Sequence, residues 1–145
     1  MITNTPSFEK FWEVNSSSSF EKLALDIFNL QYKKNNIYRS FCSLINISPC
    51  DIKKVEDIPH LPISFFKFKK VVSYDKKPTG YFSSSKTSGS IPSKHFYRSL
   101  EDYTKSFTKG FENFYGRFSD YVFLALLPSY IRQKNSSLIF MVNEL

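Results

Sequence analysis

The chain has 145 residues, of which 41% are hydrophobic and 18% aromatic. Its 20 Lys and Arg residues against 13 Asp and Glu residues give a net charge of +7, and the length allows one domain. So many aromatic rings exclude a disordered tail, and the lack of roughly 18 consecutive apolar residues excludes a membrane-spanning helix. Charged side chains among the first 30 residues are not typical of a secretory signal, so a cytoplasmic location is expected.

Residues 1–50 are predicted to form a helical lead-in of three helices. The first carries aromatic residues at three- and four-residue steps. The second is expected to begin at Ser18, with Glu21 as its capping-box partner, and the third at Asn35 or Asn36. Apolar residues recur on one face of the last two helices, so these faces are expected to pack on a core.

Residues 51–145 are predicted to alternate strands with helices, which makes the fold class α/β. Prolines and β-branched pairs such as Val71-Val72 favour short extended segments and turns in the middle of the chain. Ser99 is expected to cap a helix that ends at Gly116.

The last part of the chain combines an apolar run with a final helix. Residues Tyr121–Leu127 are continuously apolar, and a proline follows them. Such a run is typical of a buried strand that delivers a loop at its carboxyl end. Ser136 and Ser137 can cap a last helix over residues 138–145.

The cysteines and histidines do not form a metal-binding motif. Cys42 and Cys50 are expected to be free thiols, because two cysteines in 145 residues do not make a disulfide framework. His60 and His95 lie too far apart for local metal-ligand spacing, so no metal held by protein side chains is expected. The lysines are scattered along the chain; they suit a surface that tolerates anions, and no nucleic-acid partner is expected.

The segment 82–96, FSSSKTSGSIPSKHF, has the composition of an anion-binding loop, with seven Ser or Thr hydroxyls, one glycine and two lysines. Backbone N–H groups and hydroxyls of such a loop can surround an anion while a lysine supplies charge. The pattern differs from the GxxxxGK[ST] loop of nucleoside triphosphatases, because Lys94 comes five positions after the single glycine, Gly89. On composition alone, a solvated serine-rich hairpin is the favoured interpretation.

This segment resembles, without gaps, the FxSSGTTGxxPSKH pattern of the acyl-protein synthetase family, the LuxE-like branch of the adenylate-forming acyl ligases. Two more blocks agree in order and spacing: LPISFFK at 61–67, and Tyr115-Gly116 followed by LALLPSY at 124–130 and SSLIFMVNEL at 136–145. The resemblance implies an incomplete N-terminal portion of an adenylate-forming ligase fold. It covers nearly the whole chain and is most specific over residues 59–145.

The resemblance further implies that ATP, with Mg²⁺, activates a fatty or other carboxylic acid to an acyl adenylate. The acyl group is then transferred to a thiol acceptor. The implied partners are the acid and an acyl-acceptor protein. Preorganised donors stabilise the charge that develops on pyrophosphate oxygens. The implied phosphate contacts all lie in the segment 82–96: Ser84, Ser85, Lys86, Thr87, Ser88, Gly89, Ser93, Lys94 and His95. Pro128, Ser129 and Tyr130 would border the carboxylate or acyl pocket, by analogy with related ligases.

Several of these residues have a second interpretation. Lys86 occupies the position of the pattern's first glycine, where its side chain either obstructs the approach of a phosphate or adds a positive contact. His95 either orients a phosphate or is a strand histidine hydrogen-bonded for structure. Cys42 lies on an apolar helical face, so a buried structural thiol is favoured over an acyl acceptor, and Cys50 has no base nearby in sequence.

Family members are considerably longer than this chain, so we expect no turnover from it alone, and the sequence identifies no catalytic residue. The competing hypothesis is a non-catalytic truncated remnant that binds an acyl ligand or a protein through exposed core. Nucleotide binding separates the two hypotheses. A small basic nucleic-acid binder ranks last, and its affinity would fall steeply with salt.

Overall fold

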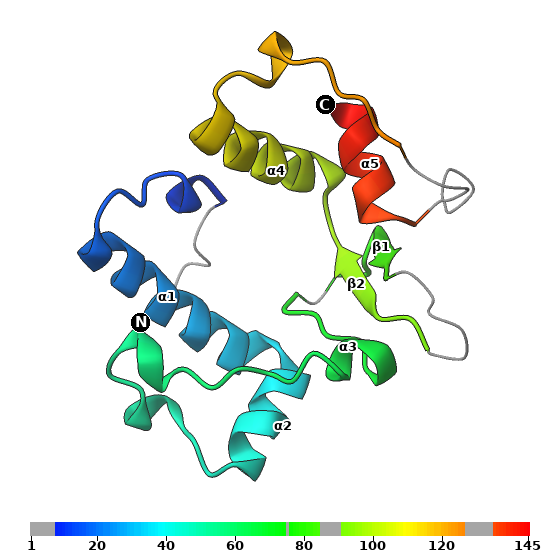
Figure 1. Ribbon diagram of the computed structural model, residues 1–145. Helices are drawn as coiled ribbons and strands as arrows, with labels where there is room; N and C mark the ends of the chain where they lie inside the picture. The colour runs from blue at the N-terminus through cyan, green and yellow to red at the C-terminus, as the bar shows by residue number, and fades with distance from the viewer. Residues whose placement is uncertain (1–7, 75, 85–90, 127–134) are drawn as a thin grey trace. The chain divides into compact units, whose positions relative to one another are not determined.

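The structure is a computed structural model that describes residues 8–74, 76–84, 91–126 and 135–145. The chain divides into two compact units, Met1–Lys76 and Lys77–Leu145. The described part is rich in helix and has a small two-stranded sheet, which is compatible with the α/β class (Figure 1). Within this part, no helix is long and apolar enough to cross a membrane.

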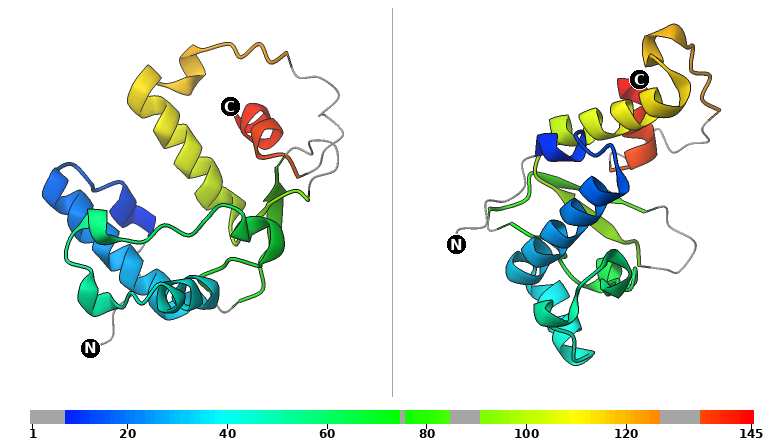
Figure 2. Two further views of the ribbon diagram at one scale, coloured as in Figure 1. Left: turned by 60° about the horizontal axis from the view of Figure 1, so that its bottom comes forward. Right: turned by 90° about the vertical axis from the view of Figure 1, so that its left-hand side faces the viewer.

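The described residues of the predicted helical lead-in, 8–50, contain the second and third expected helices, whereas the first expected helix is only a 3-10 turn. The two long helices of the first unit are α1 (Ser17–Lys34) and α2 (Asn36–Leu44), and the remaining elements are short. These are the 3-10 turns η1 (Phe8–Phe11), η2 (Pro49–Asp51) and η3 (Val55–Asp57) and the single helical turn α3 (Phe65–Phe68), which lies where the sequence predicts loop and strand. Figure 2 shows these elements from two further sides.

A single buried residue, Asn35, joins the two long helices. Its N–H donates to the carbonyl of Gln31 at 2.8 Å and ends α1, while its side-chain oxygen accepts from the N–H of Tyr38 at 3.2 Å and begins α2. The amide nitrogen of the same side chain donates to Gln31 Oε1 at 3.1 Å. Asparagine suits this corner because its short amide side chain satisfies backbone groups at a helix end. The predicted cap is thereby confirmed.

The start of α1 differs from the prediction. The N-cap is Ser16 instead of Ser18, and the capping box closes on Ser19 instead of Glu21. The N–H of Ser19 donates to Ser16 Oγ at 3.2 Å, and the N–H of Ser16 donates to Ser19 Oγ at 3.1 Å. A hydroxyl therefore takes the role that the glutamate carboxylate has in the usual box.

The core of the first unit forms where α1 and α2 meet the chain that follows them. Phe28, Tyr38, Cys42 and Ile52 are its buried members. The rings of Phe28 and Tyr38 meet edge to face with centroids 6.1 Å apart, and the hydroxyl of Tyr38 donates to the carbonyl of Pro59 at 2.7 Å. That bond fixes the segment after η3 to α2.

The second unit is built around an antiparallel hairpin of β1 (Gly80–Ser83) and β2 (Lys94–Tyr97). Helix α4 (Leu100–Tyr115) follows, then the 3-10 turn η4 (Phe118–Asp120) and helix α5 (Ser137–Glu144). The ring of Phe82 is buried and lies 4.8 Å from that of Tyr103 in α4 and 5.6 Å from that of Phe140 in α5, centroid to centroid. These ring contacts hold the hairpin against both helices.

The predicted caps of α4 and α5 are confirmed, and α5 begins and ends one residue earlier than the predicted 138–145. Ser99 Oγ accepts from the N–H of Asp102 at 3.0 Å, and Gly116 ends α4 with a φ of +85°, a conformation that residues with a Cβ rarely adopt. Ser136 caps α5 through the N–H of Ile139 at 3.3 Å. Serine hydroxyls thus begin both helices.

The predicted buried strand at Tyr121–Leu127 is wrong over its described residues, 121–126. These residues pair with no strand in the described part of the chain, and Val122, Leu124 and Leu126 are 88%, 93% and 100% exposed. Within residues 121–126, the rings of Tyr121 and Phe123 both contact the ring of Phe111, each with centroids 5.4 Å apart. An apolar run becomes a buried strand only where neighbouring strands accept its backbone groups, and the described residues provide none.

Replacing Phe28 by alanine tests the core of the first unit. Phe28 is 3% exposed, so Phe28→Ala removes a fully packed ring and is expected to lower the free energy of unfolding by about 3–5 kcal/mol. Phe20 lies on the same helix but is 53% exposed, and Phe20→Ala is the matched control with a much smaller expected loss. Urea unfolding followed by circular dichroism measures both, and equal losses would contradict this core.

Candidate functional site

The two ends of the segment between β1 and β2 are tied together by a pair of hydrogen bonds between Ser84 and Ser93. The N–H of Ser84 donates to the carbonyl of Ser93 at 3.1 Å, and the N–H of Ser93 donates to Ser84 Oγ at 3.0 Å. Ser93 is buried. We call this pair of bonds the serine clamp. It fixes the two ends of the hydroxyl-rich segment, which is the part of the chain from Ser84 to Ser93 that joins β1 to β2.

Much of the predicted site lies outside the described residues. This holds for five candidate phosphate contacts and for all three candidate substrate contacts: Ser85, Lys86, Thr87, Ser88 and Gly89, and Pro128, Ser129 and Tyr130. The structure places the remaining candidates, Ser84, Ser93, Lys94 and His95, at the base of the hairpin. Their roles stay predictions.

Among the described residues, the Ser84 hydroxyl makes one hydrogen bond, within the clamp, and its proton is not used there. A serine hydroxyl has one donor and two acceptor sites. In Ser84 an acceptor site is used by the N–H of Ser93. The hydroxyl proton can therefore still donate to an anion while the same oxygen holds the chain.

Lys94 and His95 lie on opposite faces of the hairpin, because successive side chains of a strand point to opposite sides. Lys94 pairs with Ser83, and its ammonium nitrogen lies 5.0 Å from the centroid of the Tyr81 ring. His95 pairs with the buried Phe82, and its Nε2 lies 3.4 Å from Ser93 Oγ. The structure therefore brings His95 together with the serine clamp and holds Lys94 on the other face.

The end of β1 is also attached to the start of α5. The N–H of Ser83 donates to the carbonyl of Asn135 at 2.8 Å, and Asn135 directly precedes Ser136, the N-cap of α5. This bond places Asn135 beside the end of β1, next to Ser84 of the serine clamp. Sequence reasoning missed Asn135 because the contact is made by its backbone carbonyl, which no side-chain pattern reveals.

The two thiols differ in environment, and the free state of both and the burial of Cys42 agree with the sequence prediction. Both are free; Cys42 is fully buried in the first unit, whereas Cys50 is exposed. Burial raises the pKa of the Cys42 thiol and disfavours the nucleophilic thiolate. A structural role for Cys42 follows.

Two other features of the described residues do not add to this site. These residues contain no group of three or more His, Cys, Asp or Glu side chains that could hold a metal ion. A hollow of about 220 Å³ lies near the start of α1, and none of the predicted site residues lines it. Its lining combines charges of both signs with small and apolar side chains: Lys10, Glu13, Val14, Ser19, Lys22, Leu23 and Asp26.

Comparison with known proteins points to one family. The sequence model of the family described as acyl-protein synthetase, LuxE, matches residues 2–136. Over 70 residues the chain is 36% identical to a long-chain-fatty-acid–luciferin-component ligase of Photorhabdus luminescens. That alignment covers 48% of this chain and 60% of the relative, so it spans only part of each protein. No solved structure matches the chain significantly.

The serine clamp predicts a specific effect of Ser84→Ala. The substitution leaves the N–H of buried Ser93 without its acceptor, which costs about 1–3 kcal/mol. We expect faster hydrogen exchange at the Ser93 amide, measured by NMR. The control is Ser83→Ala, because among the described residues the hydroxyl of Ser83 bonds only to the neighbouring carbonyl of Ser84, at 3.3 Å. Unchanged exchange in Ser84→Ala would show that the clamp does not form.

The exposure of the thiols predicts their reactivity. In the native protein, a thiol reagent is expected to modify Cys50 rapidly, and Cys42 only after denaturant unfolds the chain. The variant Cys50→Ser should then show no rapid phase. Rapid modification of both thiols in native wild-type protein would contradict the buried placement of Cys42 and reopen it as an acyl acceptor.

Proposed function

Because the chain belongs to the acyl-protein synthetase (LuxE) family, we propose that it binds ATP through the segment between β1 and β2 and takes part in activating a fatty or other carboxylic acid. The observation that carries this proposal is the serine clamp, which fixes the ends of a hydroxyl-rich segment and leaves the Ser84 hydroxyl proton available. Lys94 follows at the exit of the segment and brings a positive charge.

In the proposed reaction, a carboxylate oxygen of the acid attacks the α-phosphorus of ATP, and the bond to the β-phosphate oxygen breaks. An acyl adenylate forms and pyrophosphate leaves. A thiolate then attacks the acyl carbonyl and AMP leaves. Negative charge grows on the pyrophosphate oxygens in the first step, and fixed hydroxyl, N–H and ammonium donors stabilise it without reorganisation. Ser84 and Lys94 are the described residues that we assign to this role. We also propose that the chain forms part of an adenylate-forming ligase fold.

Mg²⁺ fits this proposal as an ion that the nucleotide carries. Mg²⁺ usually keeps several waters and binds through substrate phosphates and one or two carboxylates instead of a protein cage. The ion would neutralise phosphate charge while hydroxyl and ammonium groups orient the phosphates.

The acid and the acceptor are proposed by class. The Photorhabdus relative is named for a long-chain fatty acid, and we propose a fatty acid here as well, with Pro128, Ser129 and Tyr130 at its carboxylate end. The acceptor is proposed to be a thiol, and Cys42 is disfavoured for this role because it is fully buried and burial raises its pKa.

A second candidate function is supported by the exposure of residues 122–126. Val122, Leu124 and Leu126 present three nearly fully exposed apolar side chains, which is typical of a surface that binds another molecule. A non-catalytic module of this kind would bind an acyl ligand or a protein without any need for nucleotide.

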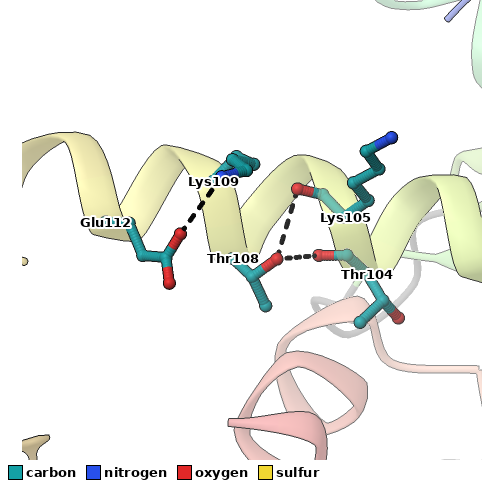
Figure 3. A network of polar contacts seen from close by, with 5 residues as sticks. All are labelled: Thr104, Lys105, Thr108, Lys109 and Glu112. Atoms are coloured by element: carbon teal, nitrogen blue, oxygen red, sulfur yellow. Dashed lines mark hydrogen bonds and ion pairs between the residues drawn. The ribbon is translucent and has the colours of Figure 1, made fainter. Parts of the chain in front are cut away.

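Calorimetric titration with ATP and Mg²⁺ separates the two functions. The acyl-activating function predicts measurable binding, weakened about tenfold or more by Lys94→Ala, since a hydrogen bond to a charged group contributes about 1.5–3 kcal/mol. The matched control is Lys109→Ala on α4: Lys109 is an exposed lysine whose ammonium pairs with Glu112 at 3.6 Å (Figure 3). Its removal is expected to leave ATP affinity unchanged.

Two outcomes would contradict the proposal. Absence of binding at millimolar ATP would favour the non-catalytic module. Equal losses in Lys94→Ala and Lys109→Ala would mean that ATP responds to net charge instead of to the hairpin.

A further inference from the structure

Tyr81 lies against the ammonium group of the lysine to which the proposed function assigns a phosphate contact. The centroid of its ring is 5.0 Å from Lys94 Nζ, within the roughly 6 Å over which an aromatic face attracts a cation. The strand register explains the contact. Tyr81 and Lys94 stand on the same face of the hairpin, diagonal to one another, because Ser83 pairs with Lys94 and Tyr81 pairs with Phe96.

The Tyr81 ring is itself supported from the side. Phe96, its cross-strand partner, lies with its ring centroid 5.8 Å from that of Tyr81. Both rings are only half-buried, whereas Phe82 on the opposite face is buried. The face that carries Tyr81 is therefore available for a role other than filling the core.

The contact with the Tyr81 ring leaves the positive charge of Lys94 available to bind an anion. No carboxylate among the described residues forms an ion pair with Lys94, and the side chain is exposed. An aromatic face attracts the ammonium group through its quadrupole and does not neutralise it, unlike a carboxylate. The ammonium is thus held in place while its full charge remains for an anion.

We propose that Tyr81 is a positioning residue that holds the ammonium of Lys94 at the exit of the hydroxyl-rich segment, ready for a phosphate group of ATP. The inference rests on the proposed function for the identity of the anion. A lysine side chain that is free in solution loses much rotamer freedom when it binds. A ring that already restricts the side chain reduces this loss and so strengthens binding.

The first experiment measures the contact itself. Lysines are methylated with ¹³C, which keeps their charge, and the Lys94 signal is identified by its disappearance in Lys94→Arg. The ring of Tyr81 is expected to displace this signal upfield in the wild type and in Tyr81→Phe, and the displacement should vanish in Tyr81→Leu. A signal that stays in place in Tyr81→Leu would overturn the inference.

The second experiment measures binding of ATP with Mg²⁺ by calorimetry. Tyr81→Leu is expected to raise the Kd about two- to fivefold, and Tyr81→Phe should restore wild-type affinity because the ring suffices. Phe114→Leu removes an exposed ring on α4 and is the control expected to have no effect. Equal weakening by Tyr81→Phe and Tyr81→Leu would assign the effect to the hydroxyl and overturn the inference.

A third variant keeps the test decisive if Tyr81→Leu does not fold. Replacement of Tyr81 by pentafluorophenylalanine keeps the ring shape but removes the negative face that attracts the ammonium, so it should weaken ATP binding as Tyr81→Leu does. Wild-type affinity in this variant would overturn the inference. Absence of ATP binding by the wild type would overturn the proposed function, whereas wild-type binding that no Tyr81 variant changes would overturn only the role of Tyr81.

Discussion

The candidate site depends on the two hydrogen bonds between Ser84 and Ser93. These residues are nine positions apart, and bringing them together closes a loop, which costs conformational entropy that the clamp and the short β1–β2 ladder must offset. The bond from Ser83 to the carbonyl of Asn135 attaches the same end of the segment to α5. Three backbone donors thus determine where the segment begins and ends, before any ligand is present.

Helix ends were predictable from the sequence because their determinants are local. The caps at Asn35, Ser99 and Ser136 each depend on a side chain and a backbone N–H three residues later. The start of α1 was predicted two residues too late for the same local reason. A run of four serines offers several equivalent caps, and Ser16 with Ser19 satisfies both orphan donors by hydroxyls alone.

The wrong prediction at residues 121–126 has a non-local cause. An apolar run indicates that burial of a segment is favourable, but strand pairing depends on strands elsewhere in the chain. In the described part of the chain, the sheet contains only β1 and β2. The site shows the same division. The family resemblance implied phosphate contacts in the segment 82–96, whereas the contacts of Tyr81 and Asn135 required the strand register and a backbone hydrogen bond, neither of which a linear pattern contains.

The strand register also separates the functions of two adjacent residues in the PSKH stretch. An anion that contacts Lys94 approaches the face of Tyr81 and Ser83, whereas His95 lies on the opposite face beside Ser93. Ser93 takes part in the clamp through its N–H and carbonyl, and the His95 ring lies beside its hydroxyl. Both sequence interpretations of His95 stay predictions, whereas Lys94 carries the charge that an ATP phosphate would meet in the proposed function.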